Sequence, residues 1–429
     1  MDFDHALSYL DTHTSYTKTG RIDSPTVENI AGLCAAMADP QHAQPVIHVT
    51  GTNGKGSTVQ MITGLLMAHG LTVGTYTSPH LEHITGRIRR NGEPISPDEF
   101  GEQVAGIAAV EELTGIRPTY FEAVTAAAFR WFADVAVDVA VIEVGMLGRW
   151  DATNVVNAQV AVVTNIALDH TEFAGPALVD IAREKAGIIK PNSAAVIGET
   201  RPELVDIFRQ EGGASTLVRG DDFDVVDNSL AVGGRSLDLR TPTSVYTDVF
   251  LPVHGAYQGE NAAIALTAAE TFFAAPLDDE MVREGLGSVE IPGRFETLGV
   301  QPLVVLDGAH NPAGADTCAS VFFDDFQPEG RRILVVGTLR DTDEMVAALR
   351  ADEFDVVHTC TAPSPRGRTG VEMARAAREL GCEEIYVHDS VEEACIAALR
   401  QADADDAILV AGSLYVAGAA RPVLTRLIG

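Results

Sequence analysis

A glycine-rich turn with one lysine and one serine is the first feature of the chain that could do chemistry. It lies in the stretch 46–62, VIHVTGTNGKGSTVQMI, which reads as an apolar strand, a turn and a helix. Glycines let a backbone approach a bound anion closely, and turn N–H groups and a helix N-terminus favour phosphate. Lys55 would neutralise β- and γ-phosphate charge, and the Ser57 hydroxyl could bind Mg²⁺. We therefore predict a nucleotide-phosphate cradle rather than a turn without a chemical role.

The spelling of this turn departs from the common phosphate-loop pattern G-x-x-x-x-G-K-[ST]. Val49 stands where that pattern has its first glycine, and Gly56 separates Lys55 from Ser57. Only four of the 30 basic residues are lysines: Lys18, Lys55, Lys185 and Lys190. A chain with so few lysines that keeps one inside a glycine turn indicates a need for an amine there.

Two more polar residues follow apolar runs. Glu143 ends the run in VIEVGMLGRWDATN, and His170 comes just after the run in VAVVTNIALDHTEFAG. Because the carboxyl ends of parallel strands share one edge of a sheet, these side chains and Ser57 could converge on one metal ion. Oxygen ligands favour Mg²⁺, for which an imidazole is a less usual partner. A histidine after a strand is more often structural, so the combination carries this prediction.

Three weaker signals stand further along the chain. Lys185 lies in IAREKAGIIKP, where a solvated helix face is the ordinary interpretation and the scarcity of lysine favours a functional one. The motif VVLDGAHNPAG places Asp307, His310 and Asn311 after an apolar run, at a ligand edge of a second sheet. In LVAGSLYVAG, Ser413 occupies a strand-to-helix turn that could hold a carboxylate.

The elements that must position these residues follow an alternating pattern. Continuous Val, Ile and Ala runs predict strands buried on both faces of a parallel sheet: 46–50, 72–76, 137–144, 160–165 and 194–197. Helices are expected after Ser57, from Tyr120, and over 176–186. The fold class is therefore α/β, with a P-loop-type doubly wound parallel sheet domain.

The pattern of apolar and polar residues changes in the second half of the chain. The stretch 222–251 alternates and contains Gly-Gly, which predicts a β-hairpin, and a helix is expected over 260–273. Pro292-Gly293 is a plausible hinge. A second α/β series of strands is then expected at 303–306, 333–336, 355–358, 384–387 and 407–410. We predict two domains, 1–292 and a smaller Rossmann-like α/β domain, 293–429.

Composition excludes several classes of protein. The 429 residues are 46% hydrophobic and 21% charged, which suits a globular chain with real cores. No apolar run is long enough for a membrane span, and the N-terminus lacks a signal-peptide layout. The five cysteines are scattered and never spaced as C-x-x-C, which indicates a reduced compartment. We expect a cytoplasmic protein acting on small molecules.

The charge balance is extreme. Thirty basic against 61 acidic residues give a formal net charge of −31, which argues against a nucleic-acid-binding surface. Acidic residues are spread along the chain, as in proteins kept soluble in concentrated salt, where screening weakens self-repulsion. A halophilic source is therefore predicted, with an ordinary acidic enzyme as the alternative.

The motifs together resemble one family. The loop GTNGKGS resembles the Mur ligases, ATP-dependent amide-forming ligases, and its glycine before the serine is similar to the folylpolyglutamate synthase/dihydrofolate synthase branch. The resemblance continues in order through YTSPHLEHITGRIRRNGEPIS, TYFEAVTAAAF, VIEVGMLGRWDATN, LDHTEFAG, REKAGIIKP, GAYQGENAAIA, PGRFE, LDGAHNP and GSLYVAG. It spans almost the whole chain, and it implies that the domain 1–292 binds ATP and that the domain 293–429 binds glutamate. With the charge balance, it indicates a haloarchaeal member.

The resemblance implies a role for each matching residue. The ATP-binding positions are Thr52, Asn53, Gly54, Lys55, Gly56, Ser57, Asn261, Arg294 and Asp307. The ligands of two Mg²⁺ ions are Ser57, Ser78, Glu143, His170 and Lys185, the lysine as a carbamate, with K⁺ as a further ion. The catalytic positions are Lys55, Lys185, His170 and His310. The pterin and glutamate positions are Ser78, Pro79, His80, Thr119, Phe121, Glu122, Arg149, Asp151, His310 and Ser413.

The chain departs from the family's usual pattern beside the pterin pocket. Leu147 stands for one glycine of the usual pair after Glu143, and Trp150 stands for a leucine. Glu172-Phe173 replaces a common Asp-Trp. These differences bear on the form of the substrate more than on the reaction.

The implied reaction is the ATP-dependent joining of L-glutamate to a pterin-linked carboxylate, dihydropteroate or a folyl-polyglutamate, through an acyl phosphate by a monomeric enzyme. Two alternatives stay open. One is a Mur-type amide ligase with a non-folate acceptor, which the short stretch before the turn disfavours because a UDP-sugar domain is missing. The other is a P-loop ATPase without ligase chemistry, which would need neither Lys185 nor a second domain.

Overall fold

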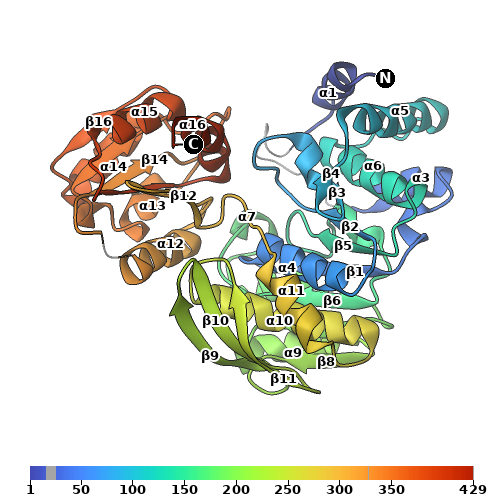
Figure 1. The fold of residues 1–429 in the computed structure, drawn as a ribbon. Coiled ribbons are helices and arrows are strands. Elements are labelled where there is room, and N and C mark those ends of the chain that lie inside the picture. Colours follow the sequence, from blue (N-terminus) through green and yellow to red (C-terminus); the bar gives the residue numbers. More distant parts are fainter. Residues whose placement is uncertain (16–25, 327, 429) are drawn as a thin grey trace. The chain divides into compact units, whose positions relative to one another are not determined.

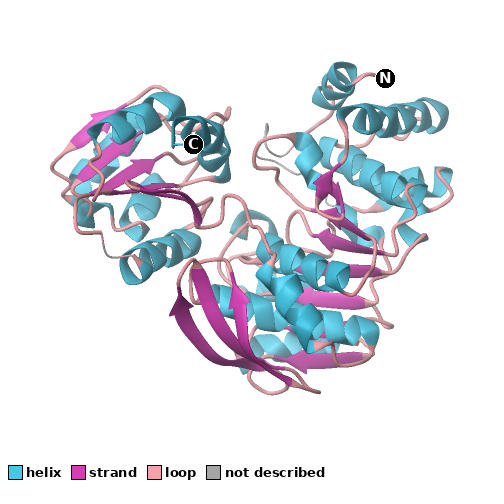
Figure 2. Cartoon of the chain, in the orientation of Figure 1, coloured by secondary structure: helices cyan, strands magenta, loops and turns pink. Residues whose placement is uncertain are grey.

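The computed structural model describes residues 1–15, 26–326 and 328–428. It divides into two compact units, each with its own sheet (Figures 1 and 2). The first comprises Met1–Ala231, Arg235–Pro252 and Tyr257–Val289. The second comprises Val232–Gly234, Val253–Ala256 and Glu290–Gly429. None of the described helices is long and apolar enough to cross a bilayer.

The first unit is built on an eight-stranded sheet in the order β4-β3-β2-β5-β1-β6-β7-β8. Its strands are β1 Val46–Thr50, β2 Val73–Tyr76, β3 Ile88–Arg90, β4 Glu93–Pro94, β5 Val139–Glu143, β6 Val160–Val163, β7 Ala194–Ile197 and β8 Ser215–Val218. Six neighbouring strands run parallel, β2, β5, β1, β6, β7 and β8, and β3 and β4 add an antiparallel edge beside β2. All five expected strands are confirmed, since their continuous apolar runs are buried on both faces.

Helices accompany this sheet (Figure 2). They are α1 Phe3–Asp11, α3 Glu28–Ala36, α4 Lys55–Ala68, α5 Pro97–Thr114, α6 Tyr120–Asp134, α7 Thr171–Ala174, α8 Leu178–Ala186, α9 Pro202–Glu211, α10 Tyr257–Phe273 and α11 Asp279–Gly287. Short 3₁₀ turns cover η1 Pro40–His42, η2 Ile84–Arg87 and η3 Ala152–Val155. The helix expected over 176–186 begins only at Leu178, where the Asp180 carboxylate accepts from Ala177 N–H at 3.2 Å.

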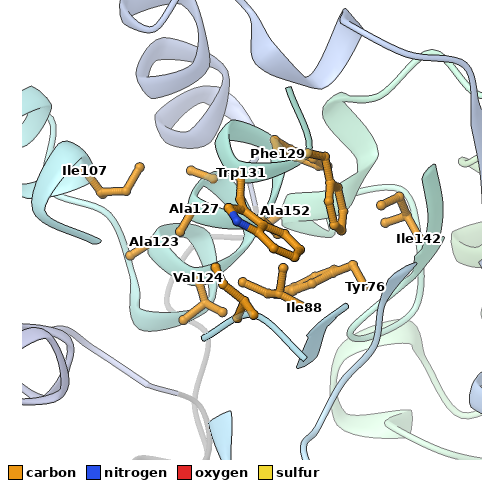
Figure 3. Close-up of a cluster of buried hydrophobic side chains, with 14 of the residues drawn as sticks. Tyr76, Ile88, Ile107, Ala123, Val124, Ala127, Phe129, Trp131, Ile142 and Ala152 are labelled. Atoms are coloured by element: carbon orange, nitrogen blue, oxygen red, sulfur yellow. The ribbon is translucent and has the colours of Figure 1, made fainter. Parts of the chain in front are cut away.

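The alanine-rich helix α6 lies against the sheet through a large apolar cluster. Figure 3 shows Phe129 and Trp131 of α6 gathered with Tyr76 and Ile142 of the strands. The Tyr76 hydroxyl also hydrogen-bonds Thr125 Oγ1 at 2.9 Å, so the one polar atom of that ring is satisfied inside the core. This packing fixes the direction of α6 and therefore the place of its N-terminus.

An antiparallel sheet replaces the simple hairpin expected over 222–251. Its order is β11-β10-β9, with β9 Asp224–Ala231, β10 Gly234–Arg240 and β11 Val245–Leu251. The hairpin β9–β10 is confirmed, but the third strand was missed. Alternate residues of β10 and β11, including Leu237, Leu239 and Val249, are fully buried, so this sheet has one apolar face.

The second unit contains a six-stranded sheet in the order β12-β13-β17-β14-β15-β16. Its strands are β12 Glu296–Val300, β13 Leu303–Leu306, β14 Arg332–Val336, β15 Val356–Thr359, β16 Ile385–Val387 and β17 Ala407–Ala411. Its helices are α12 Pro312–Asp325, α13 Thr342–Ala348, α14 Gly370–Leu380, α15 Val391–Gln401 and α16 Leu414–Ile428, with a 3₁₀ turn, η4 Ala351–Glu353. The five expected parallel strands are confirmed, and β12 joins them as an antiparallel edge.

Candidate active site

The glycine turn between β1 and α4 is tied to the end of β6. Asn165 accepts two hydrogen bonds from N–H groups of the turn. The Thr52 N–H donates to the Asn165 main-chain oxygen at 2.9 Å, and the Asn53 N–H donates to Asn165 Oδ1 at 3.0 Å. Thr164 Oγ1 donates to the Asn53 carbonyl at 2.6 Å. A Cβ at Gly51 would lie 1.8 Å from Thr164 Oγ1, so only glycine fits there. The residues that follow β6 therefore hold this turn in place.

Helix α10 also contributes to this turn. A Cβ at Gly54, whose φ is +81°, would lie 2.5 Å from Asn261 Oδ1. The Asn261 amide is itself oriented, because its Nδ2 donates to Gln258 Oε1 at 2.9 Å. Asn261, an expected ATP-binding residue, therefore reaches the start of α4 from a helix far along the chain.

Two lysines converge on one carbonyl of the turn. Lys185 Nζ donates to Gly51 O at 2.7 Å, and Lys55 Nζ donates to the same oxygen and to Thr52 O, each at 3.1 Å. Lys185 is buried, and burial, with the nearby charge of Lys55, lowers the pKa of its amine well below the usual range. The solvated helix face that a lysine directly after Arg183 and Glu184 would suggest is therefore wrong for Lys185.

The Glu143 carboxylate lies beside the start of α4 and accepts from the segment after β2. Glu143 Oε2, at the end of β5, accepts from Ser78 N–H at 3.0 Å. A Cβ at Gly56 would lie 3.7 Å from the same oxygen, and the next residue, Ser57, is buried. The Ser78 Oγ is buried with no hydrogen-bond partner among the described residues. This donor set of carboxylate and hydroxyl oxygens fits Mg²⁺.

His170 lies in a segment anchored to the glycine turn. Thr52 Oγ1 accepts from Ala167 N–H at 3.0 Å and donates to Ala167 O at 3.1 Å. His170 then adopts a left-handed conformation, φ 50°, before α7, and its Nε2 lies 3.6 Å from Asp169 Oδ2. Asp169 was not singled out from the sequence, although it directly precedes His170. Within the described ranges, no three His, Cys, Asp or Glu side chains form a metal cluster by themselves.

The segment 145–155 contains the expected substrate residues Arg149 and Asp151, so we call it the acceptor turn, and it is organised around Asp151. Its Oδ1 accepts from Thr153 N–H at 3.0 Å and from Thr153 Oγ1 at 2.6 Å, and its Oδ2 accepts from Met146 N–H at 2.8 Å. Burial raises the pKa of the Asp151 carboxyl, and these hydrogen bonds oppose that effect. A Cβ at Gly145 would lie 2.4 Å from Phe121 Cζ, so the turn packs on the start of α6.

Several expected substrate residues have structural partners. Thr119 and Glu122 form a capping box on α6, with Thr119 N–H donating to Glu122 Oε2 at 2.7 Å. The Arg149 guanidinium binds Glu211 at 2.9 Å and the Arg183 carbonyl at 3.1 Å. Their roles toward a substrate stay predictions.

The segment after β2 carries two more expected substrate residues. His80 Nδ1 accepts from Arg87 Nε at 3.0 Å. Burial, with Arg87 nearby, lowers the pKa of His80 to about 4, so its ring is neutral near pH 7. Pro79 lies between His80 and Ser78 and is exposed.

The second unit gathers its expected residues at the carboxyl ends of β13 and β17. The buried Asp307 accepts from Phe295 N–H at 2.9 Å and from Ala309 N–H at 2.8 Å. Burial raises the pKa of Asp307, and the Arg294 guanidinium opposes this. Sequence reasoning missed Cys318 of α12, whose thiol also hydrogen-bonds Asp307.

His310 and Ser413 lie on the two turns that follow these strands. His310 is exposed, with its Nδ1 3.2 Å from Gly308 O. The Ser413 Oγ accepts from Val416 N–H at 3.1 Å, at the start of α16. Ser413 is thus engaged with its own helix terminus in this structure.

Comparison with known proteins gives the class first. The Mur ligase middle domain matches residues 49–269, and the Mur ligase glutamate ligase domain matches residues 293–414. The dihydrofolate synthase/folylpolyglutamate synthase of Mycobacterium tuberculosis is 38% identical, over 95% of this chain and 91% of that protein. A probable bifunctional folylpolyglutamate synthase/dihydropteroate synthase of Haloferax volcanii is 37% identical over 99% of this chain, which spans 51% of that longer protein.

A solved structure agrees with these relatives. The folylpolyglutamate synthase of Mycobacterium tuberculosis complexed with ADP and AMPPCP matches with a TM-score of 0.90 and 36% identity, over 99% of each chain. The chain therefore belongs to the Mur ligase family, within its dihydrofolate synthase/folylpolyglutamate synthase branch. The predicted fold class is confirmed as well.

Proposed function

We propose that the protein is an ATP-dependent ligase that joins L-glutamate to a pterin-linked carboxylate, dihydropteroate or a folyl-polyglutamate. The observation that carries this proposal is the meeting of the glycine turn, Glu143 and Lys185 at one sheet edge. It occurs in a chain that matches a dihydrofolate synthase/folylpolyglutamate synthase over 95% of its length.

The chemistry requires activation of the acceptor. A carboxylate is a poor electrophile, so its oxygen attacks the γ-phosphorus of ATP, and the bond from that phosphorus to the β–γ bridging oxygen breaks. ADP leaves and an acyl phosphate remains. The neutral amine of L-glutamate then attacks the acyl carbon, phosphate leaves, and the amine's proton passes to a base. The products are an amide, ADP and phosphate, and the scheme needs no other co-reactant.

The residues of the first unit fit two Mg²⁺ ions. Ser57, Ser78, Glu143 and His170 would hold them, and the buried unsatisfied Ser78 Oγ supports this assignment. When bound, Mg²⁺ neutralises charge on the transferring phosphoryl group. K⁺ is a further ion that we expect to support activity.

Lys185 is proposed to carry a carbamate. Burial favours its neutral amine, which can add to the carbon of CO₂ with loss of one proton. The nitrogen of the carbamate keeps one N–H, which can still donate to Gly51 O. The new oxygens would extend the carboxylate-rich edge formed by Glu143.

The chain's own residues would do the remaining work. The amides and lysine of the glycine turn would bind the phosphates of ATP, with Lys55 moving from the Gly51 and Thr52 carbonyls onto the β- and γ-phosphates. In the second proposed domain, 293–429, Arg294 and Asp307 would hold ATP. His310 and Ser413 would hold glutamate, using groups that follow β13 and β17.

We also propose a halophilic source and a monomeric, cytoplasmic enzyme. The net charge of −31 and the near absence of lysine support adaptation to concentrated salt. The Haloferax relative supports the same reading. Ion-pair arginines are common on both units, for example Arg331 with Asp406 at 2.9 Å.

One assay tests the reaction. ADP release is measured in molar KCl with ATP, L-glutamate and either dihydropteroate or tetrahydrofolate. We expect release only when glutamate and a pterin substrate are both present, and the better of the two acceptors identifies the substrate form. Nucleotide turnover that ignores glutamate would favour an ATPase. Turnover that needs glutamate but not a pterin would favour a Mur-type ligase with another acceptor.

A further inference from the structure

A histidine of the central strand lies beneath the acceptor turn. His48 of β1 is fully buried, and its Nε2 lies 2.8 Å from Thr153 Oγ1, a residue 105 positions further along the chain. Burial, assisted by the charge of Lys190, lowers the pKa of His48 to about 3. The ring is therefore neutral at neutral pH, with a proton on only one of its nitrogens.

The neighbouring groups decide which nitrogen carries the proton. Thr153 Oγ1 lies 2.6 Å from Asp151 Oδ1, and the N–H groups of Thr153 and Met146 also point to this carboxylate. Because the carboxylate accepts these bonds, the Thr153 hydroxyl uses its one proton toward Asp151. Its oxygen must then accept from His48, so Nε2 carries the hydrogen.

The second ring nitrogen of His48, Nδ1, is energetically unfavourable where it lies. His48 Nδ1 is buried and has no hydrogen-bond partner in the described part of the chain. An unsatisfied buried nitrogen is unfavourable, and an apolar side chain at this position would avoid that cost. Thr153 alone could still bond Asp151, but its hydroxyl would be free to rotate. His48 removes that freedom.

The same strand holds the turn at a second point. Thr50, two residues on and on the same face of β1, donates from Oγ1 to Leu147 O at 2.5 Å. His48 and Thr50 thus fasten both sides of the turn 145–155 to the strand that leads into the phosphate turn. One rigid element therefore sets the place of both binding regions.

We propose that His48 is a positioning residue for the acceptor pocket, acting through Thr153 on Asp151 and the turn 145–155. This proposal rests on the proposed function, because it assigns that turn to the pterin substrate. It makes His48 responsible for acceptor binding and not for ATP or glutamate binding.

The first test replaces the imidazole. His48→Leu should raise KM for the pterin acceptor about tenfold, the order expected when one buried hydrogen bond to a binding element is lost. KM for ATP and for glutamate should stay within about twofold, since neither site is reached through Thr153. His48→Gln, whose amide can donate to Thr153, should restore most of the acceptor affinity. An unchanged acceptor KM in a folded His48→Leu enzyme, or equal rises for all three substrates, would overturn the proposal.

The second test asks whether the effect passes through the hydroxyl. Thr153→Val should itself raise the acceptor KM, and His48→Leu should add little in that background. If the rises in acceptor KM of the two single variants multiply in the double variant, His48 does not act through the Thr153 hydroxyl and the proposal is contradicted. If His48→Leu does not fold, the acceptor KM can still be compared between His48→Gln, Thr153→Val and wild type. A wild-type acceptor KM in Thr153→Val would refute an action of His48 through Thr153.

A matched control is available in the second unit. His358 of β15 is also a buried strand histidine, with Nε2 3.0 Å from Gln401 Oε1, and burial likewise lowers its pKa to about 4. His358→Leu should lower Tm, because it removes two hydrogen bonds of the buried ring, but it should leave the acceptor KM unchanged. A rise in the acceptor KM that matches the rise in His48→Leu would assign the His48 effect to general destabilisation. A wild-type enzyme without glutamate-dependent turnover would defeat the proposed function itself. An active wild-type enzyme whose acceptor KM is unchanged in His48→Leu would contradict this inference alone and leave the proposed function standing.

Discussion

At the scale of single residues, burial changes what a lysine can do. The Lys185 amine sits 2.7 Å from Gly51 O, away from water, and shares that oxygen with Lys55. Two cations cannot share such a site at low cost, so burial and the charge of Lys55 lower the pKa of the Lys185 amine. A neutral amine is the form that reacts with CO₂, whereas an exposed lysine would stay protonated near pH 7.

Removing Lys185 should therefore remove most activity. Lys185→Ala is expected to lower kcat by about a hundredfold or more, because the proposed carbamate, which would help stabilise charge on the phosphoryl group, is lost. Acetate or formate should restore part of it by supplying a carboxylate in the space left. Steady-state ADP release with and without the additive measures this.

Lys190→Ala is the matched control for this experiment. Lys190 Nζ bonds Gly187 O at 3.3 Å and does not reach the glycine turn, so its loss should leave kcat near wild type. Full activity in Lys185→Ala would refute the role of the lysine.

At the scale of elements, the acceptor turn contains a leucine in a conformation that favours glycine. Leu147 has φ 59°, in the left-handed region that glycine adopts without strain. A left-handed non-glycine residue costs roughly 1–2 kcal/mol. Its carbonyl is held by Thr50 Oγ1, so β1 keeps the backbone in place despite that cost.

Two substitutions separate strain from packing at this position. Leu147→Gly should keep the free energy of unfolding within about 1 kcal/mol of wild type, since relief of strain offsets glycine's entropy. Leu147→Val should lower it by about 1–2 kcal/mol, because a β-branched residue tolerates this region poorly. Urea unfolding measures both. Leu168→Val, at an exposed leucine, is the control and should change it by less than about 0.5 kcal/mol. Equal stability of Leu147→Val and wild type would contradict the strain.

The contact between α1 and α5 gives an element-scale prediction for pH. Burial raises the pKa of Glu111, but hydrogen bonds from Tyr9 and His13 outweigh it, and the net pKa is lowered from 4.5. A carboxylate with a lowered folded pKa contributes stability that is present above its unfolded pKa and is lost as pH falls through the folded value.

Glu111→Gln should therefore flatten the acid limb of the stability curve. Tm is compared below and above about pH 4.5, and wild type should lose more Tm than the variant as the pH falls. Glu112→Gln, at the exposed neighbour on the same helix, should retain the wild-type slope. An unchanged acid limb in Glu111→Gln would show that this carboxylate does not carry the effect.

At the scale of the whole molecule, burial on both faces made most of the fold predictable. Strands such as Val46–Thr50 form continuous apolar runs and were found. β12, Glu296–Val300, was missed because ETLGV is a short edge strand with Val300 exposed, so it carries no such run. β11 was missed for a related reason, since exposed polar residues lie between its buried ones and interrupt the apolar run.

The site was predictable as a set of residue types and not as a set of contacts. Spacing indicated that Ser57, Glu143 and His170 follow strands at one sheet edge. It could not indicate that Lys185 reaches Gly51, or that Arg149 binds Glu211, because these contacts depend on how α8 and α9 pack. Glu122 illustrates the limit, since a capping box occupies its carboxylate within its own helix.

The net charge of −31 leads to a prediction for the whole chain. Self-repulsion among carboxylates opposes the compact state, and the screening length falls from about 10 Å at 0.1 M salt to about 3 Å at 1 M. Tm should therefore rise steadily between about 0.1 and 2 M KCl. Thermal unfolding followed by circular dichroism measures Tm across this range of KCl concentrations. A Tm that falls or stays level in KCl would contradict salt adaptation and leave an ordinary acidic enzyme.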